Sequence, residues 1–132
     1  MNVEVQEEWY SVEQCNENPN KLYVFGDNTH RYGKGGQAMI RDETNSYGIA
    51  TKRTPSMRPD AFFGDTQVDG DIMISDIKGL MEVFEEGDYD TIVLPAAGLG
   101  TGLSKMPEYS PKLFKALNSS LSQLLNIDYN PS

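Results

Sequence analysis

The chain has 132 residues, 38% hydrophobic and 23% charged, a balance typical of one globular domain and not of a disordered segment. Twenty acidic residues against eleven basic ones give a net charge of −9. This charge argues against a protein that binds duplex DNA, because such proteins need a basic face to displace counterions from the phosphates. A small anionic ligand is not excluded, since backbone amides can bind phosphate without side-chain charge.

The composition also indicates a cellular compartment. The single cysteine, Cys15, cannot form a disulfide within the chain, which favours a reducing environment. The first ten residues are acidic and lack the apolar stretch of a secretory signal. No apolar run reaches the roughly 18 residues of a membrane helix. We therefore expect a cytoplasmic protein that forms one domain over residues 1–132 and has no membrane partner; its oligomeric state is left open.

Apolar runs in the chain predict a buried sheet. Residues 22–25, 47–51 and 91–94 are short, apolar and bounded by turn-forming residues, which is typical of buried strands. Residues 1–10 alternate at Val3 and Val5 and are consistent with an edge strand.

Helical patterns separate these strands. Residues 37–42 follow a glycine-rich turn, residues 72–84 have apolar side chains at helical spacing, and a last helix begins near Pro107 or Ser110. Strands separated by helices over this length predict an α/β fold, with a parallel or mixed sheet and helices on both faces.

Two glycine-rich loops carry the strongest functional signal. Residues 33–38 and 95–102 each follow an apolar strand and precede a helix, and glycine lets a backbone approach a ligand closely. Because ligands of open α/β sheets bind at the carboxyl ends of the strands, two such loops predict a phosphate-bearing nucleotide. The candidate ligand-binding residues are Gly26, Asp27, Asn28, Arg31, Gly35, Gly36, Gln37, Gly98, Leu99, Gly100, Thr101, Gly102, Leu103 and Ser104.

Neither loop fits a standard fingerprint. Lys34 precedes the glycine pair, whereas the lysine of an NTPase phosphate loop follows it, and residues 98–102 lack the third glycine of a dinucleotide motif. This argues against a kinase and against a dehydrogenase. His30 is the only histidine, so we expect no zinc site and no Ser-His-Asp triad. We also expect no cofactor.

The order of these motifs resembles a macrodomain, most closely the terminal ADP-ribose protein glycohydrolase branch. The resemblance covers about residues 22–125 and rests on the glycine turn that opens a short helix at residues 33–38, the strand end at residues 49–53, and the P-x-x-G-x-G loop at residues 95–100. It implies a three-layer α/β/α sandwich with a mixed, largely parallel sheet and a cleft for ADP-ribose. It also implies that Asp27 or Asn28 meets the adenine or its ribose, and that Lys52 attacks the anomeric carbon of the distal sugar.

The chain departs from that branch at the general base. The branch has an aspartate after its second glycine loop, and here the position falls on Gly102 or Ser104. We therefore expect a protein that binds ADP-ribose or a related NAD-derived nucleotide. Two alternatives stay open: an ADP-ribosyl glycohydrolase that uses Lys52 with another carboxylate, and a nucleotide-binding domain similar to the lysine-decarboxylase-like nucleoside phosphate hydrolases.

Several charged residues have two interpretations. Arg31, Lys34 and Arg41 either contact phosphate or form ion pairs with Asp42 and Glu43. Arg53 is a neighbouring cation that would lower the pKa of Lys52, but adjacent residues on a strand point to opposite faces of the sheet. The acidic residues at 65, 69 and 71 are interpreted as a solvated loop, because the closing glutamate of a calcium site is missing.

Overall fold

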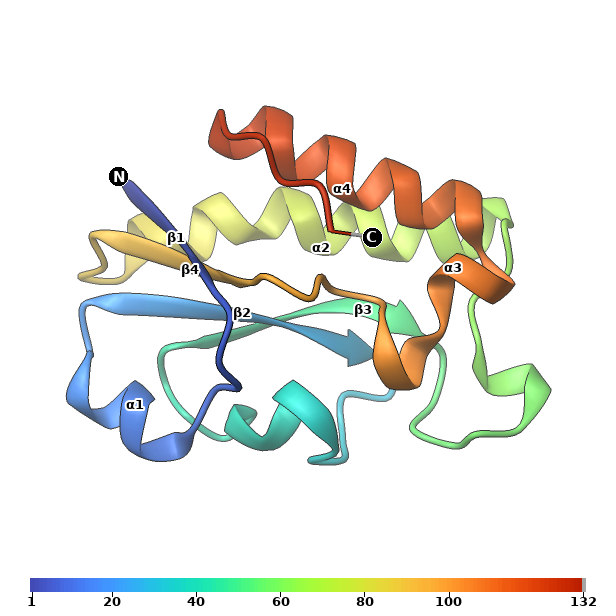
Figure 1. Ribbon diagram of the computed structural model, residues 1–132, viewed down its shortest axis with the longest axis horizontal. Helices are drawn as coiled ribbons and strands as arrows, with labels where there is room; N and C mark the ends of the chain where they lie inside the picture. Colours follow the sequence, from blue (N-terminus) through green and yellow to red (C-terminus); the bar gives the residue numbers. More distant parts are fainter. Residues whose placement is uncertain (132) are drawn as a thin grey trace.

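The computed structural model describes residues 1–131 and arranges the chain as one four-stranded sheet (Figure 1). The strand order is β1-β4-β2-β3, and each pair of neighbours is parallel. The strands are β1 Asn2–Gln6, β2 Lys21–Asn28, β3 Ser46–Lys52 and β4 Thr91–Pro95. All four carboxyl ends therefore lie at one edge of the sheet, which is where both glycine-rich loops begin.

The sheet corrects one expectation. Its named strands are all parallel rather than mixed, and antiparallel pairing is limited to an isolated bridge between Lys52 and Phe62. The reason is that a helix lies in each connection between consecutive strands, so every strand starts from the same end of the sheet. The expected edge strand at the N-terminus is confirmed as β1, which pairs only with β4.

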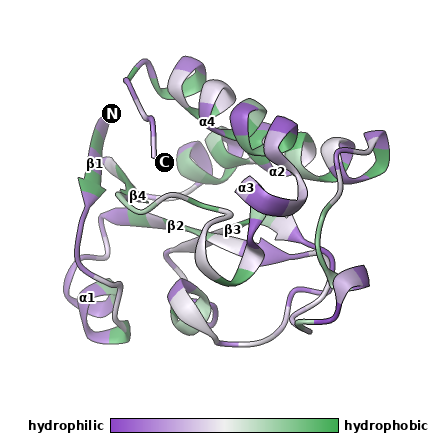
Figure 2. Ribbon diagram, turned by 45° about the vertical axis from the view of Figure 1, so that its right-hand side comes forward, coloured by the Kyte–Doolittle hydropathy of each residue, from purple (hydrophilic) through white to green (hydrophobic). Residues whose placement is uncertain are grey.

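Helices cover both faces of the sheet, as the sequence predicts for an α/β domain (Figure 1). The long helices α2 and α4 lie together on one face, and the short helix α1 and the 3-10 helix η1 lie on the other. Figure 2 shows apolar and polar residues alternating around α2 and α4, as expected of helices with one buried side. The helical bounds are α1 Val12–Glu17, η1 Gly36–Ile40, η2 Pro59–Ala61, α2 Gln67–Glu86, η3 Gly102–Ser104, α3 Met106–Tyr109 and α4 Pro111–Leu125.

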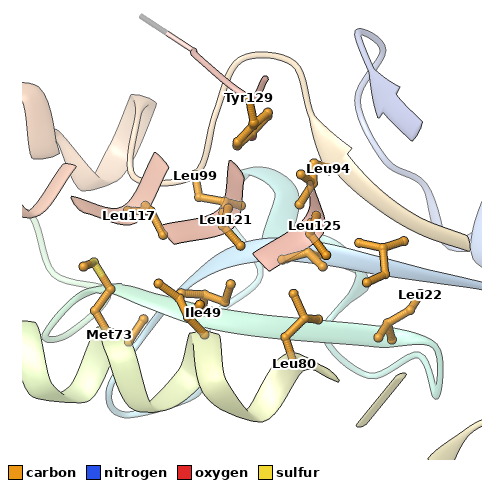
Figure 3. Close-up of a cluster of buried hydrophobic side chains, with 14 of the residues drawn as sticks. Leu22, Ile49, Met73, Leu80, Leu94, Leu99, Leu117, Leu121, Leu125 and Tyr129 are labelled. Atoms are coloured by element: carbon orange, nitrogen blue, oxygen red, sulfur yellow. The ribbon is translucent and has the colours of Figure 1, made fainter. Parts of the chain in front are cut away.

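Alternation along β2 builds a separate core on each face. Leu22 and Val24 point toward α2 and α4, where they join a cluster that includes Leu80 and Leu121 (Figure 3). Tyr23 and Phe25 point toward α1 and η1 and join the second cluster. The two clusters bury the central strands β2 and β4 on both faces, and the two glycine-rich loops follow these two strands.

Helix α2 starts earlier than its apolar pattern predicts. The Thr66 hydroxyl accepts a hydrogen bond from Asp69 N at 3.2 Å, so α2 begins at Gln67 and not near residue 72. Asp69 and Asp71 are therefore helical, and the interpretation of this acidic run as a loop is wrong for both. Asp69 is also buried, at 2% exposure. Among residues 1–131, none of the helices combines the length and the apolar character needed for a membrane span.

Candidate functional site

The two glycine-rich loops line one cavity at the carboxyl edge of the sheet. Its volume is about 690 Å³, within the range of about 300–1,000 Å³ typical of small-molecule sites. The end of β1 supplies a third wall. The lining residues are Gln6, Glu7, Trp9, Gly26, Gly35, Gly36, Gln37, Pro95, Ala97, Gly98, Leu99, Gly100, Thr101, Gly102, Leu103 and Ser104.

The second loop leaves backbone donors without acceptors. Gly98, Gly100 and Gly102 all have positive φ angles, between +58° and +94°, which fold the loop into tight turns. Within residues 1–131, the amides of Leu99, Gly100 and Thr101 donate no hydrogen bond. Unpaired N–H groups in a glycine-rich turn are well suited to bind an anion. Because the Leu99 side chain is buried at 1% exposure, only its backbone can serve a ligand.

Gly26 lets β2 and the second loop come together. A Cβ atom at this position would lie 3.4 Å from Gly100 N and 3.3 Å from Thr51 Oγ1, tighter than side chains normally tolerate beside backbone. On the other side of the cavity, the exposed Leu103 side chain reaches the first loop, where a Cβ on Gly35 would lie 3.2 Å from it. The two loops therefore touch at Gly35 and Leu103.

A smaller pocket of about 110 Å³ lies beyond that contact. Gly26, Gly35, Leu103 and Ser104 line both cavities, so the two are neighbours. The residues found only in the smaller one include Asp27, Asn28, Tyr32, Gly33, Ala38, Arg41, Lys52 and Pro55. The predicted site residues are thus divided between the larger cavity and the smaller pocket. Arg31 is the exception, because it lines neither.

Asp27, which the resemblance places, with Asn28 as the alternative, against the adenine or its ribose, is held by two arginines. Arg41 donates to both of its carboxylate oxygens, and Arg31 Nη1 lies 3.5 Å from Oδ2. The amide of Asn28 also donates to Oδ1, at 2.8 Å. Arg31 in turn donates to both oxygens of Asp76, at 2.9 and 2.8 Å. Both arginines are therefore in ion pairs, though with Asp27 and Asp76 and not with Asp42 or Glu43.

The two predicted amide side chains also have partners within the protein. Asn28 Nδ2 donates to Tyr32 O at 2.8 Å, and Asn28 Oδ1 accepts from His30 N at 3.0 Å, which shapes the turn after β2. Gln37 Oε1 accepts from Tyr10 N at 2.8 Å. Lys34 forms its ion pair with Asp42, one of the two partners expected for it.

Lys52 is the one buried lysine of the smaller pocket. It is 5% exposed, its Nζ lies 3.3 Å from Met57 Sδ and 4.8 Å from the ring centre of Phe62, and within residues 1–131 it has no carboxylate partner. Burial, and secondarily the Lys105 ammonium, lower the pKa of Lys52. A lysine in such surroundings has a larger neutral, nucleophilic fraction than one in water.

The cation that acts on Lys52 differs from the one the sequence suggested. Arg53 turns away and donates to both carboxylate oxygens of Asp69, at 3.1 and 2.7 Å. Lys105, far along the chain, is the neighbour instead. Ser104, at the position where the resembled branch has its base, hydrogen-bonds Thr51 Oγ1 at 2.8 Å. Of the acidic residues, Glu7 lines the larger cavity and the arginine-held Asp27 lines the smaller one.

Sequence reasoning missed the third wall of the cavity. Gln6, Glu7 and Trp9 follow β1, and the pairing of Gln6 with Pro95 puts this segment beside the second loop. Ala96 N donates to Gln6 O at 2.8 Å, which extends the pairing into the loop. The available signal was the expected edge strand at residues 1–10, whose carboxyl end must share the edge with the loops.

Residues 5–120 match the model of a family described as "Family of unknown function (DUF7831)". The chain belongs to this family. The matched range contains both glycine-rich loops, Lys52 and the third wall of the cavity. No curated protein and no solved structure matches the chain significantly.

The Arg53–Asp69 pair predicts a loss of stability in acid. Burial alone would raise the pKa of Asp69, but hydrogen bonds from Arg53, Gly64 N and Thr66 outweigh it and lower the pKa. The stabilisation is therefore full above the unfolded-state pKa of about 4 and disappears as the pH falls through the lower folded-state value. We expect Asp69→Asn to lose about 1–2 kcal/mol of unfolding free energy at neutral pH, since Arg53 is half-exposed.

Urea unfolding at several pH values measures this effect. The stability difference between Asp69→Asn and the parent should stay constant from pH 7 down to about pH 4 and then shrink as the pH falls further toward the lowered pKa of Asp69. A difference that stays constant below about pH 4 as well would mean that the ion pair does not stabilise the fold.

Proposed function

We propose that the chain binds ADP-ribose, or a related NAD-derived nucleotide, between its two glycine-rich loops. The observation that carries this proposal is the cavity of about 690 Å³ that both loops line, with the amides of Leu99, Gly100 and Thr101 lacking acceptors within residues 1–131. A diphosphate supplies the acceptor oxygens that such amides need. Binding through amides also suits an anionic ligand on a chain with a net charge of −9.

The sizes of the two cavities suggest how the ligand lies. The smaller pocket, about 110 Å³, lies well below the roughly 300–1,000 Å³ typical of small-molecule sites, whereas the larger cavity of about 690 Å³ lies within that range. We place the adenosine in the larger cavity, the diphosphate where the loops touch at Gly35 and Leu103, and one edge of the distal ribose toward Lys52. This layout differs from the one the resemblance implies, in which Asp27 or Asn28 meets the adenine or its ribose.

We further propose that the domain is a macrodomain-like three-layer sandwich that acts in the cytoplasm. The fold is supported by helices on both faces of a parallel sheet and by ligand loops at its carboxyl edge. Its sheet departs from the mixed type that the resemblance implies. Nothing in the described residues points to a metal, since they contain no group of three or more acidic, cysteine or histidine side chains placed to hold one.

Glycohydrolase activity is the second candidate, and one observation favours it. Lys52 is buried without a carboxylate partner and its pKa is lowered, as a nucleophile for the anomeric carbon requires. The missing partner is the general base, because neither Gly102 nor Ser104 bears a carboxylate and Asp27 is held by Arg41. General acid–base assistance is worth about 10²–10⁴-fold in rate, so its loss favours the binder.

Thermal unfolding with a panel of ligands tests the proposal. A ligand that binds only the folded state raises the melting temperature by mass action, by about 2.7 kcal/mol of stability at a hundred times its Kd. We expect ADP-ribose to raise it most, NAD and ADP to raise it less, and AMP and ribose 5-phosphate to raise it least. No increase with ADP-ribose would refute the proposal. A larger increase with AMP would favour the nucleoside-phosphate-hydrolase-like alternative.

The variant Lys52→Ala separates the binder from the enzyme. For a binder, we expect the Kd for ADP-ribose to rise less than about tenfold, because the lysine contributes only one polar contact. We also expect the parent to release little ADP-ribose from modified protein. Calorimetry measures the first quantity and chromatography of released ADP-ribose the second. Rapid multiple-turnover release that disappears in Lys52→Ala would make the protein an enzyme.

A further inference from the structure

Trp9 lies in the segment after β1, which forms the wall of the larger cavity that the sequence did not predict. It is the only tryptophan in the chain, and 65% of it is exposed although it lines the cavity. An indole ring in this position contributes little to folding, because most of its surface remains in water. A large apolar ring on the wall of a ligand-sized cavity is available for contact with a ligand.

The backbone on both sides of Trp9 is fixed. Gln6 Nε2 donates to Glu8 O at 3.0 Å and to Trp9 O at 3.4 Å, and the Gln6 amide exchanges two hydrogen bonds with that of Gln14. After Trp9, the Tyr10 amide donates to Gln37 Oε1 and the buried Tyr10 hydroxyl donates to Val24 O at 2.9 Å. The protein therefore holds an exposed indole at a defined place beside the first glycine-rich loop.

Charge decides which end of a nucleotide lies near Trp9. The carboxylate of Glu7, two residues before Trp9, also lines the cavity, and it repels a diphosphate. The unpaired amide of Gly100, which lies beside Gly26 of β2, and the ammonium group of Lys52 in the smaller pocket attract the diphosphate toward β2. The end of the ligand that carries no negative charge, the nucleoside base, is the part that fits against Trp9.

We propose that Trp9 stacks on the base of the bound nucleotide and makes the site select a purine nucleotide over a bare sugar phosphate. This inference rests on the proposed function and names the residue that recognises the base. Stacking requires only a π face, so Trp9 contributes affinity for the ring system, and its exposed ring needs no rearrangement of the backbone. Aromatic stacking on a base corresponds to about a 5- to 100-fold change in affinity.

The single tryptophan makes the proposal directly measurable. Titration of the full chain with ADP-ribose should change the Trp9 fluorescence along a saturating curve with the same Kd that calorimetry gives. Trp9→Ala should raise that Kd at least fivefold, and Trp9→Phe should restore most of the affinity because phenylalanine keeps a π face. Val68→Ala, which truncates another exposed apolar side chain outside the cavity, should leave the Kd unchanged.

The possible outcomes separate this inference from the proposed function. If ADP-ribose binds by calorimetry but Trp9→Ala keeps the parental Kd and the fluorescence does not change, the role of Trp9 is refuted and the loop site stands. If the parent does not bind ADP-ribose, both are refuted. Because Trp9 is mostly exposed, Trp9→Ala should keep the parental melting temperature, and this measurement shows that any loss of binding is local.

Discussion

Asp27→Ala is expected to destabilise the protein by about 3 kcal/mol, the largest stability effect that we predict for the residues of the site. The substitution removes both carboxylate acceptors of Arg41, whose side chain is only 14% exposed, and leaves its charge with only the backbone carbonyls of Gly33 and Tyr32. Arg31 loses one of its two carboxylates, and the amide of Asn28 loses its acceptor. Removing one member of a buried ion pair costs more than the pair itself contributes, because the other charge stays desolvated.

Urea unfolding measures the effect, and an exposed ion pair supplies the control. Asp42→Ala removes the partner of Lys34 in a pair whose two side chains are more than half exposed, so the free energy of unfolding should hardly change. Asp27→Asn keeps the shape and one acceptor and should lie between Asp27→Ala and the parent. If Asp27→Ala keeps the parental stability but loses ADP-ribose binding, Asp27 contacts the ligand as the resemblance implies. In that case its assignment as a structural partner of Arg41 and Arg31 is wrong.

Gly36→Asp is expected to weaken ADP-ribose binding about 100-fold, the largest effect on binding that we predict. Gly36 lines the larger cavity where the loops meet, and a Cβ atom there has no neighbour within 4 Å. Its φ of +61° is a conformation that asparagine and aspartate tolerate better than most other residues. A carboxylate placed there faces the diphosphate, and like charges in contact cost several kcal/mol, or about tenfold in affinity per 1.4 kcal/mol.

Gly36→Asn is the matched control, because it has nearly the same shape and no charge. Calorimetry should give Gly36→Asn an affinity within a few-fold of the parent, so that the difference between the two variants reports charge alone. Equal affinities for the two variants would mean that no phosphate lies at Gly36. Gly100 is unsuitable for this purpose, since any Cβ atom there would collide with Met106 and disturb the packing of α3.

The elements that the sequence predicted well are those with strong local patterns. The apolar run at residues 22–25 lies inside β2 and that at residues 91–94 inside β4, because both strands are central and buried. Helix α2 was predicted too short, since its first turn is polar and only the Thr66 cap marks its start. Both glycine-rich loops were identified because each combines several glycines with a position between an apolar strand and a helix.

The features that the sequence did not predict depend on residues far apart in the chain. Lys105, more than fifty residues away in the chain, contributes to the lowered pKa of Lys52. Lys105 has a left-handed backbone conformation, with φ +46°, that no local sequence pattern predicts. The pairing of Asp27 with Arg41 depends on how the first loop folds back. Trp9 reaches the cavity only because β1 pairs with β4. Tertiary pairing, and not local propensity, decides each of these contacts.

Amide chemical shifts measured by NMR during titration with ADP-ribose show which backbone N–H groups bind the diphosphate. We predict that the largest shifts fall on the amides of residues 99–103 and of Gly35 and Gly36, because these backbone N–H groups are proposed to hold the diphosphate. Smaller shifts should appear at Trp9. Shifts that instead cluster around the separate cavity of about 540 Å³ between α4 and residues 128–131, or no shifts at millimolar ADP-ribose, would contradict the account.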